Sequence, residues 1–571
     1  MKKLINRPEH VVAEMLEGFI AIYPHLSLLA EHNVLLRSDA EEMRERQVAV
    51  ISGGGSGHEP AHGGYVGAGM LSAAVAGEVF TSPDPQSILA AIHGVGGSPG
   101  VLLIVKNYTG DRLNFGIAAE IARSQHIPVE MVLVADDLAL AGTYQPAGAR
   151  GIAGTVFVHK IAGAAAAEGR SLNQVAAVAR AAADSVASMG VSLSAGTVPA
   201  VGQPSYTLGE REIELGLGIH GEPGIRRVAL PSADELASQM VEIILAAQQL
   251  APREPIAVLV NNLGSTTLME LAIYARRALS VLASRDLIVE RVYVGTFMSS
   301  LEAAGVSLSL LRLDAERLRY LDAATSAPAW RPASDQSLRK LESRIVASRF
   351  PEYLRQATKA AAEKNTSLEA AVEAACAALL EAESRLTDMD RVVGDGDLGA
   401  NLARAARAVQ SALPTYPLHD ASATLKTLAL TVQAALGGSS GPLYGVFFLR
   451  AATPLTTANA NDPRAWADAA LEGCHAIAAL GGANAGDRTM LDALLPFANT
   501  FRGALERGES VADALETAVM AAEAGARETA QMLPRRGRSS YLAERALGHP
   551  DPGASAAAIW LCAVVNLLAA S

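Results

Sequence analysis

Four aspartates lie within ten positions near the middle of the chain, and glycines flank the last two of them. They are Asp388, Asp390, Asp395 and Asp397, in a segment that ends at Gly399. Crowded carboxylates repel one another unless a cation lies among them, and hard oxygen ligands in a tight loop suit Mg²⁺, which usually keeps phosphate oxygens in its shell. No glutamate follows at the spacing of an EF-hand. The segment predicts a Mg²⁺-phosphate site, with a solvated acidic turn as the alternative.

Glycine-rich turns next to helical segments are the second feature of this half. An alanine-rich, helix-periodic segment, residues 400–413, follows the aspartates, and free N–H groups at a helix start favour metal-bound phosphate. Similar turns lie at residues 437–443, 481–489, 537–541 and 551–554. Each turn alone is equally consistent with an ordinary helix–helix loop. Together they predict several helix ends that grip one nucleotide, with Arg538 neutralising phosphate charge.

Two strand-like segments of the first half run into polar residues. Residues 53–60 form a glycine turn with His58; no Walker Gly-Lys-Ser/Thr follows, and His58 takes the place of the third glycine in a dinucleotide fingerprint. We expect backbone amides and this imidazole to face one small cavity, with a structural histidine as the alternative. After residues 101–105, Lys106 could bind a substrate oxygen and Asp111 could act as a base. The alternative is a plain turn in which Asp111 caps the next helix.

A second histidine, His220, stands between glycines in residues 216–224. The flanking glycines leave room for a ligand to contact the ring. A neutral imidazole nitrogen is a nucleophile that can add to a carbonyl group to give a covalent hemiaminal. A structural histidine or a simple hydrogen-bond donor is the alternative for this residue.

Composition excludes several classes of function. The chain has 571 residues, with 59 acidic and 47 basic side chains and a net charge of −12, which argues against a nucleic-acid partner. Aromatic residues make up 4%, so base-stacking platforms are not expected. Three cysteines without metal-ligand spacing, and no expected signal peptide, indicate a cytoplasmic location. Residues 554–571 lack charge, but their alanine content favours a buried helix over a membrane anchor.

The pattern of strand-like and helix-like segments changes once along the chain. Residues 8–330 alternate between strand-like and helix-like segments, which predicts α/β layers with a largely parallel sheet and ligands beyond the carboxyl ends of strands. A stretch of proline and small residues at 324–335 predicts a linker. Beyond it, strand signals nearly vanish and alanine-rich helical periodicity predicts a bundle or barrel.

As a set, the motifs closely resemble those of single-chain, ATP-dependent dihydroxyacetone (glycerone) kinases. In sequence order they are Gly-Gly-Gly-Ser-Gly-His-Glu-Pro, Lys-Asn-Tyr-Thr-Gly-Asp-Arg, Gly-Ile-His-Gly-Glu-Pro-Gly, Gly-Asp-Gly-Asp, Gly-Gly-Ser-Ser-Gly, Gly-Asp-Arg-Thr-Met and Asp-Pro-Gly-Ala. The resemblance covers essentially the whole chain. It implies a multidomain protein: a K domain of two α/β subdomains at residues 1–328, a linker at 329–340, and an all-α helical-barrel L domain at 341–571. It also implies a homodimer.

The resemblance implies a role for individual residues. His220 forms a hemiaminal with the substrate carbonyl, and His58 and Asp111 are the acid/base residues at the hydroxyl that receives phosphate. The substrate pocket is lined by Gly55, Ser56, Gly57, His58, Lys106 and Asp111. Mg²⁺ is held by Asp390, Asp395 and Asp397. The nucleotide is contacted by Leu398, Gly399, Ala400, Asn401, Ser439, Ser440, Gly481, Met490, Arg538, Asp551, Pro552 and Gly553. Position 398 is often polar in this family, so Leu398 is expected to contribute only its backbone.

The implied activity is phosphorylation of dihydroxyacetone, with glyceraldehyde as an expected second substrate and with ATP and Mg²⁺ as cofactors. An alternative in another enzyme class is FAD-AMP lyase activity, which forms cyclic FMN and AMP at the L-domain metal site of some similar animal proteins. A non-catalytic sensor or phosphocarrier partner is a third alternative, which the fusion of both halves and the intact aspartates disfavour.

Overall fold

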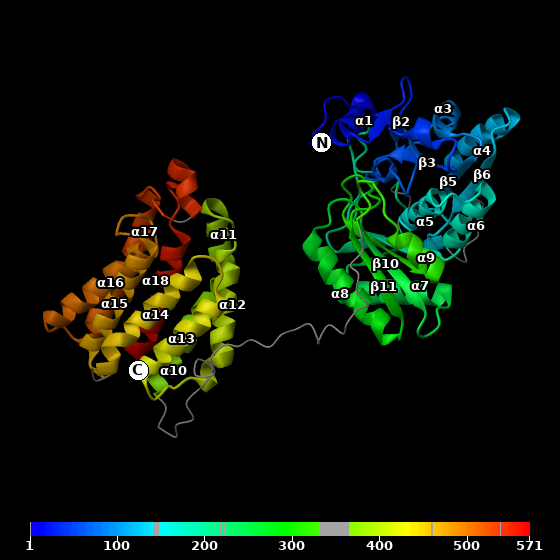
Figure 1. Ribbon diagram of the computed structural model, residues 1–571. Helices are drawn as coiled ribbons and strands as arrows, with labels where there is room; N and C mark the ends of the chain where they lie inside the picture. Colours follow the sequence, from blue (N-terminus) through cyan, green and yellow to red (C-terminus); the bar gives the residue numbers. More distant parts are fainter. Residues whose placement is uncertain are drawn as a thin grey trace. The chain divides into compact units, whose positions relative to one another are not determined.

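The computed structural model describes residues 2–140, 148–216, 218–220, 224, 226–331, 365–457, 461–536 and 538–570. The chain forms two compact units, Met1–Ala347 and Ser348–Ser571 (Figure 1). The predicted linker at 329–340 lies outside the described residues from position 332 onward, as does the first part, 338–364, of the helical region. The domain limits inferred from the sequence therefore stay a prediction.

The first sheet of unit 1 contains six strands in the order β1-β2-β4-β3-β5-β6. The strands are β1 (Leu26–Leu28), β2 (Val34–Arg37), β3 (Ala49–Ser56), β4 (Ala73–Val79), β5 (Val101–Lys106) and β6 (Val129–Val134). The last four in spatial order pair in parallel, so β3 and β5 end at the same edge. Ligands bind at such an edge in open α/β sheets. The parallel sheet predicted from the sequence is present here.

Helices cover both faces of this sheet (Figure 1). Successive strand residues face opposite sides: Ile51 and Leu103 pack with α3 (Pro85–Val95) and α4 (Thr109–Ser124), whereas Val50 and Leu102 pack with α5 (Thr155–Ala167) and α6 (Leu172–Ala183). The shorter helices are η1 (Pro8–His10), α1 (Val11–Ile22), α2 (Ala40–Met43), η2 (Gly63–Tyr65) and η3 (Leu138–Leu140).

The second sheet of unit 1 has the order β11-β10-β12-β7-β8-β9. Its elements are β7 (Val186–Ser192), β8 (Glu212–Leu215), β9 (Arg226–Ala229), α7 (Ala233–Gln248), β10 (Pro255–Asn262), α8 (Leu268–Ser284), β11 (Ile288–Gly295), β12 (Gly305–Arg312) and α9 (Ala315–Asp322). Only β10 and β11, joined across α8, pair in parallel. The prediction of a largely parallel sheet is wrong for this half, because no described helix crosses over between β7, β8 and β9 to make them parallel.

Helices, joined by short turns, are the only regular elements among the described residues of unit 2. They are α10 (Thr366–Glu381), α11 (Glu383–Val393), α12 (Leu398–Ala412), η6 (Leu413–Thr415), α13 (Ala421–Ala435), α14 (Ser440–Thr457), α15 (Pro463–Gly481), α16 (Leu491–Glu506), α17 (Val511–Glu528), η7 (Thr529–Gln531), η8 (Arg538–Ala546) and α18 (Pro552–Ala570). Each helix from α12 to α18 packs on the next, and α10 packs on both α12 and α18. The ring therefore closes into a barrel, which confirms the predicted fold class.

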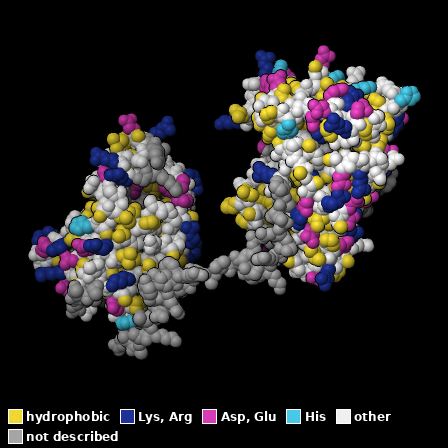
Figure 2. Space-filling model, viewed as in Figure 1, with side chains coloured by type: hydrophobic (Ala, Val, Ile, Leu, Met, Phe, Trp, Pro, Cys, Tyr) yellow, Lys and Arg dark blue, Asp and Glu magenta, His cyan; other side chains and the backbone are white. Residues whose placement is uncertain are grey.

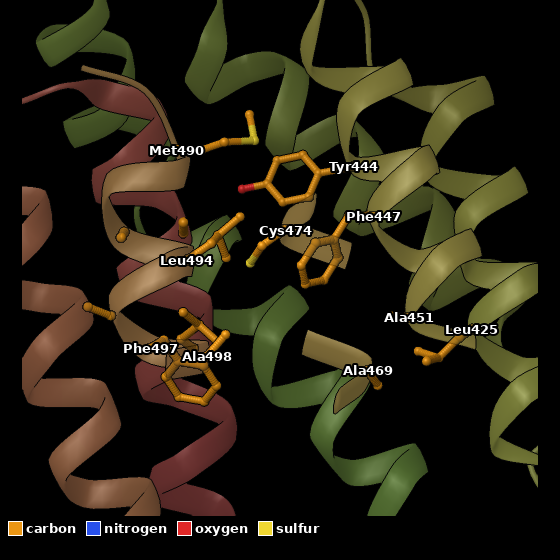
Figure 3. Close-up of a cluster of buried hydrophobic side chains, with 14 of the residues drawn as sticks. Leu425, Tyr444, Phe447, Ala451, Ala469, Cys474, Met490, Leu494, Phe497 and Ala498 are labelled. Atoms are coloured by element: carbon orange, nitrogen blue, oxygen red, sulfur yellow. The ribbon is translucent and has the colours of Figure 1, made fainter. Parts of the chain in front are cut away.

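The interior of the barrel is apolar. Figure 3 shows Tyr444, Phe447, Cys474 and Leu494 pointing toward one another from neighbouring helices. They are among the side chains that line a cavity of about 540 Å³. Helix α18 is the one described helix long and apolar enough to cross a membrane by length and composition. Its packing against α10, α16 and α17 is that of a core helix, so this feature is weak evidence for a membrane span.

Charged side chains of both signs are interspersed over the face of each unit that Figure 2 shows. No continuous basic stripe is visible on that face.

Candidate active site

The glycines before His58 belong to strand β3 rather than to a turn. Gly53 and Gly55 are buried strand residues, and neighbouring backbone leaves no room for a side chain. A Cβ atom at Gly53 would lie 2.4 Å from the carbonyl oxygen of Val75, and one at Gly55 would lie 2.5 Å from the nitrogen of Thr81. The predicted turn begins later, at Gly57, where φ is +99°.

The side chains of Lys106 and Asp111 lie close to each other beside strand β3. Lys106 ends β5, and its buried Nζ atom lies 3.9 Å from Oδ2 of Asp111 in the first turn of α4. A Cβ atom at Gly54 would lie 2.4 Å from the same Nζ atom, so only glycine leaves space there. Burial lowers the pKa of Lys106, and the Asp111 carboxylate opposes that shift. The pair therefore places an amine and a carboxyl group together at the edge where β3 and β5 end.

His58 is fully buried and its protonation state follows from its contacts. Its Nδ1 atom lies 2.8 Å from the carbonyl oxygen of Ser299. A carbonyl only accepts, so Nδ1 carries the proton and Nε2 is left as an acceptor. Nε2 has no hydrogen-bond partner among the described residues. Burial first, then the charges of His220 and Lys106, lower the pKa of His58 well below its usual value. A neutral acceptor of this kind can take a proton from a hydroxyl group.

His220 is half-buried among aromatic rings from distant parts of the unit. Its centroid lies 4.7 Å from that of His58, 4.6 Å from that of Tyr108 and 5.4 Å from that of Phe80. The backbone before it is held by the Ser300 hydroxyl, which donates to the carbonyl of Ile219. Residues 217, 221–223 and 225 lie outside the described chain. The structure thus brings His220 next to His58, as the predicted substrate pocket requires.

The four aspartates divide into one that pairs with a neighbouring arginine and a cluster of three, of which Asp395 and Asp397 are exposed. Asp388 and Asp390 belong to α11 rather than to the predicted turn. Asp388 forms an exposed ion pair with Arg391, whereas Asp390, Asp395 and Asp397 each offer an oxygen within 4.8 Å of the others. Three carboxylates at this spacing are a donor set that fits Mg²⁺.

Two glycines shape this cluster. Oδ2 of Asp390 accepts hydrogen bonds from the backbone N–H groups of Asp397 and Leu398, at 3.0 and 3.2 Å. A Cβ atom at Gly394 would lie 2.3 Å from Oδ1 of Asp390, and Gly396 has a φ of +75°. The loop can therefore fold back on Asp390 only with glycine at these positions.

The start of α12 contributes backbone to the site. The side chain of Leu398 packs against the apolar core, so its contribution here is the N–H group that reaches Asp390. A Cβ atom at Gly399 would lie 2.2 Å from the carbonyl oxygen of Glu383, which lets α12 begin against α11. Ala400 is exposed beside them. A Cβ atom at Gly437 would lie 3.5 Å from Oδ1 of Asn401, which places the turn before α14 next to the start of α12.

The other predicted nucleotide residues lie at further helix ends. Ser439 is exposed just before α14, and Ser440 begins it. Gly481 ends α15, where an added Cβ would lie 3.3 Å from the Leu443 side chain. An added Cβ at Gly553 would lie 3.9 Å from that of Met490, which is itself buried. Consecutive helices of an up-and-down ring alternate in direction, so α12, α14, α16 and α18 begin at one end.

The turn before α18 contains the predicted nucleotide residues Asp551 and Pro552, and Arg488, to which the sequence analysis gave no role, packs against it. Asp551 accepts a hydrogen bond from the Ala554 N–H, which caps α18 beside Pro552, and burial raises the pKa of this carboxyl to about 6. Arg488 is buried and donates to the carbonyls of Thr529 and His549. Arg538 begins η8, which contacts α11; its side chain is outside the described part of the structure.

Two buried histidines beside Lys106, His62 and His159, were also missed. His62 follows His58 by four positions, two residues beyond the end of its motif, and this proximity is a usable signal. His159 lies in the middle of the buried helix α5, between Val158 and Lys160, and belongs to none of the quoted motifs.

Comparisons with known proteins assign the family. A Dak1 domain model matches residues 17–329, and a DAK2 domain model matches residues 392–566. The chain is 42% identical over 575 residues to a human triokinase/FMN cyclase, covering 99% of each chain. It is 44% identical to a putative 3,4-dihydroxy-2-butanone kinase from Solanum lycopersicum, covering 98% of this chain and 97% of that one. The chain therefore belongs to the dihydroxyacetone kinase family of enzymes.

Solved structures agree with this assignment. The crystal structure of the dihydroxyacetone kinase of C. freundii matches with a TM-score of 0.62 and 35% identity, covering 100% of this chain and 99% of that one. A structure of that enzyme in complex with AMP-PNP and Mg²⁺ matches with a TM-score of 0.61, again covering 100% of this chain and 99% of that one. These matches confirm the family resemblance stated from the sequence motifs.

Proposed function

We propose that this chain is an ATP- and Mg²⁺-dependent kinase that converts dihydroxyacetone to dihydroxyacetone phosphate, with glyceraldehyde as a second substrate. The observation that carries the proposal is the gathering of His58, Lys106, Asp111 and His220 at the strand ends of unit 1. The names of two relatives, the 3,4-dihydroxy-2-butanone kinase and a D-erythrulose kinase of Mycolicibacterium smegmatis that is 35% identical, support a class of short hydroxyketones.

Covalent capture explains how so small a substrate is selected. Dihydroxyacetone offers little apolar area, so burial alone binds it weakly and without preference over glycerol. In the proposed step a ring nitrogen of His220 bonds to the carbonyl carbon, the C=O π bond breaks, and the oxygen takes up the proton that the ring gives up. Glycerol has no carbonyl group and cannot form this bond.

Proton transfer and charge stabilisation fall to the neighbouring side chains. His58 Nε2 or the Asp111 carboxylate takes the proton from the hydroxyl group that attacks phosphorus, a contribution of about 10²–10⁴-fold. The Lys106 ammonium, over Gly54, binds a substrate oxygen and keeps it in place.

The aspartates of unit 2 hold the metal of the nucleotide. Asp390, Asp395 and Asp397 are the Mg²⁺ ligands. The phosphates and the nucleoside are contacted from the starts of α12, α14, α16, η8 and α18 and from the end of α15, through Leu398, Gly399, Ala400, Asn401, Ser439, Ser440, Gly481, Met490, Arg538, Asp551, Pro552 and Gly553. Bound MgATP supplies the phosphoryl group and neutralises its charge. Phosphoryl transfer needs mainly positioning and neutralisation, which this donor set is suited to supply.

The test of the covalent step is competition between dihydroxyacetone and glycerol. Wild-type protein should bind dihydroxyacetone so that glycerol displaces it poorly, and His220→Ala should lose that advantage. If dihydroxyacetone displaced glycerol as strongly from His220→Ala as from the wild type, the covalent role of His220 would be wrong. A purified chain that consumed no ATP with any short hydroxyketone would instead favour a non-catalytic sensor.

A second activity, FAD-AMP lyase, is favoured by the relatives named triokinase/FMN cyclase. The human, bovine and rat proteins of this name are 41–42% identical to this chain over 99% of its length. The same three carboxylates would hold the divalent cation. Incubation with FAD and Mn²⁺ should then release AMP and cyclic FMN, and Asp397→Asn should abolish this release. Intact FAD after prolonged incubation would exclude the activity.

We also propose that the protein acts in the cytoplasm as a homodimer. Free, buried Cys376 and Cys474 are consistent with a reducing compartment. Light scattering of the purified chain tests the oligomeric state, with a mass of twice 59.2 kDa expected.

A further inference from the structure

Behind Lys106 lies a chain of two buried histidines that the proposed kinase reaction does not use. Nζ of Lys106 lies 3.0 Å from Nε2 of His62, and Nδ1 of His62 lies 2.9 Å from Nε2 of His159. The three side chains come from β5, from the segment after β3 and from α5, and all are buried. Three separate elements thus meet in one polar line that ends at the Lys106 ammonium.

The charge on Lys106 determines every proton along this line. An ammonium group has donors but no acceptor, so Nε2 of His62 accepts and the His62 proton lies on Nδ1. His62 therefore donates to Nε2 of His159, whose own proton lies on Nδ1. That last N–H group has no hydrogen-bond partner in the described part of the chain. Only one arrangement of protons satisfies both contacts while Lys106 is charged.

The titratable neighbours keep both histidines neutral. Burial lowers the pKa of His62 well below its usual value, and the charges of Lys106, His159 and His58 lower it further. Burial, with Lys106, lowers the pKa of His159 to about 3. The carboxylate of Asp111 lies 3.9 Å from Nζ of Lys106, and His58 is itself kept neutral by burial. Two neutral imidazoles therefore lie behind an ammonium group, and Asp111 lies beside it.

Stability alone does not explain why Lys106, His62 and His159 form a buried row of hydrogen-bonded side chains. A buried N–H group without a partner is destabilising, and most buried polar groups in folded proteins are hydrogen-bonded. The unpartnered Nδ1 of His159 lies in the buried helix α5, in which the neighbouring Lys160 does have an acceptor, the Tyr320 carbonyl. A leucine or methionine at position 159 would pack without the cost of an unpartnered N–H group. Such violations are expected where side chains serve a site.

We propose that His62 and His159 are positioning residues, which orient the Lys106 ammonium over Gly54 toward a substrate oxygen; the inference rests on the proposed kinase activity. His62 holds one N–H of Lys106 from behind, and Asp111 attracts the ammonium from the side. The ammonium nitrogen itself lies over Gly54, where an added Cβ would lie 2.4 Å from Nζ, and its remaining N–H groups are the ones available to a substrate oxygen. His159 acts through His62: its Nε2 accepts the Nδ1 proton of His62 at 2.9 Å, closer than the Ser52 hydroxyl at 3.5 Å, and so supports the tautomer that the Lys106 ammonium requires.

Four variants of the full-length chain test this role: His62→Phe, His159→Phe, His159→Gln and the control Tyr65→Phe. Phenylalanine fills the space of the ring but accepts no hydrogen bond. The amide oxygen of glutamine can still accept from Nδ1 of His62. Tyr65 lies in the same core, with its ring centroid 6.2 Å from that of His159, and donates to the carbonyl of Phe297 instead. The Tyr65→Phe change therefore removes a hydroxyl group that is also buried but takes no part in the hydrogen bonds between Lys106, His62 and His159.

The measurement is kcat and KM for dihydroxyacetone between pH 6 and 10, with melting temperatures in parallel. His62→Phe should raise KM at least about tenfold, the cost of losing a charge-assisted hydrogen bond. It should also move the alkaline limb of kcat/KM to lower pH, because an ammonium group without its acceptor deprotonates more easily. His159→Phe should shift the limb in the same direction, His159→Gln should restore it to within about 0.3 pH units of the wild type, and Tyr65→Phe should leave it unmoved.

The outcomes separate this role from the proposed activity. An active wild type with an unshifted KM and alkaline limb in His62→Phe would overturn the positioning role alone. The role of His159 would likewise be overturned if His159→Gln and His159→Phe behaved alike, since only one of them keeps an acceptor. A wild type that formed no ADP with dihydroxyacetone would overturn the proposed function itself.

Discussion

His58 and His220 lie edge to face with their ring centroids 4.7 Å apart, yet the two imidazoles have different surroundings. His58 is fully buried, donates to the Ser299 carbonyl and is kept neutral. His220 is half-buried on the segment after β8. The environments suit two roles, an internal proton acceptor and an accessible nucleophile.

The metal cluster predicts which aspartates matter for nucleotide binding. Asp395→Asn and Asp397→Asn should each raise the KM for MgATP at least about tenfold, because each removes one charged ligand from the three. Asp388→Asn is the matched control, since Asp388 lies in the same segment but pairs with Arg391 on the surface. The measurement is the KM for MgATP at several Mg²⁺ concentrations. Equal effects of all three substitutions would contradict the assignment of the cluster.

Gly394→Ala should weaken MgATP binding without changing the binding of dihydroxyacetone to the first unit. Its new Cβ would lie 2.3 Å from Oδ1 of Asp390, so the carboxylate has to move out of the cluster. Gly503→Ala in α16 is the control, because its nearest neighbour is the end of the flexible Arg507 side chain, at 3.3 Å. Calorimetric titration with MgATP should show a loss of affinity only for Gly394→Ala, while dihydroxyacetone binding stays at the wild-type level. A wild-type MgATP affinity in Gly394→Ala would refute this role of the loop glycine.

Acid should destabilise the first unit through its buried neutral histidines. The pKa of His159 is lowered to about 3, so below pH 6.5 the unfolded chain binds a proton that the folded chain does not. Stability from this residue is full above pH 6.5 and is lost as the pH falls. From pH 7 to pH 5 the loss is about 2 kcal/mol.

The measurement is the free energy of unfolding of the wild type and of His159→Gln, from denaturant titrations at pH 7, 6 and 5. The wild type should lose about 2 kcal/mol more than the variant over this range. Parallel pH dependences would show that His159 does not stay neutral in the folded protein.

The sequence predicted secondary structure best where the local residue pattern favours the same element that the folded chain contains. The apolar run before Lys106 predicts the strand that ends there, and the alanine-rich run after Gly399 predicts α12. The motif spacing also brought the metal cluster and His220 to notice. Each of these features depends on residues that are neighbours in the chain.

What the sequence could not predict depends on contacts between distant segments. Gly53–Gly55 have no strand propensity, and they extend β3 only because the backbone of β4 and of Thr81 lies against them. The antiparallel order of β7, β8 and β9 depends on pairing that no local pattern encodes. Likewise His159 meets His62 only after α5 packs against the first sheet.

The central claim is that this chain captures a hydroxyketone through His220 and phosphorylates it from MgATP, and one measurement tests it most directly. Purified full-length protein is incubated with MgATP and dihydroxyacetone, and the product is identified by ³¹P NMR alongside His220→Ala. We predict one dihydroxyacetone phosphate for each ADP formed by the wild type, and a loss of at least about 100-fold in kcat/KM for the variant. An unchanged rate in His220→Ala, or ADP formation without a phosphorylated ketose, would contradict the claim.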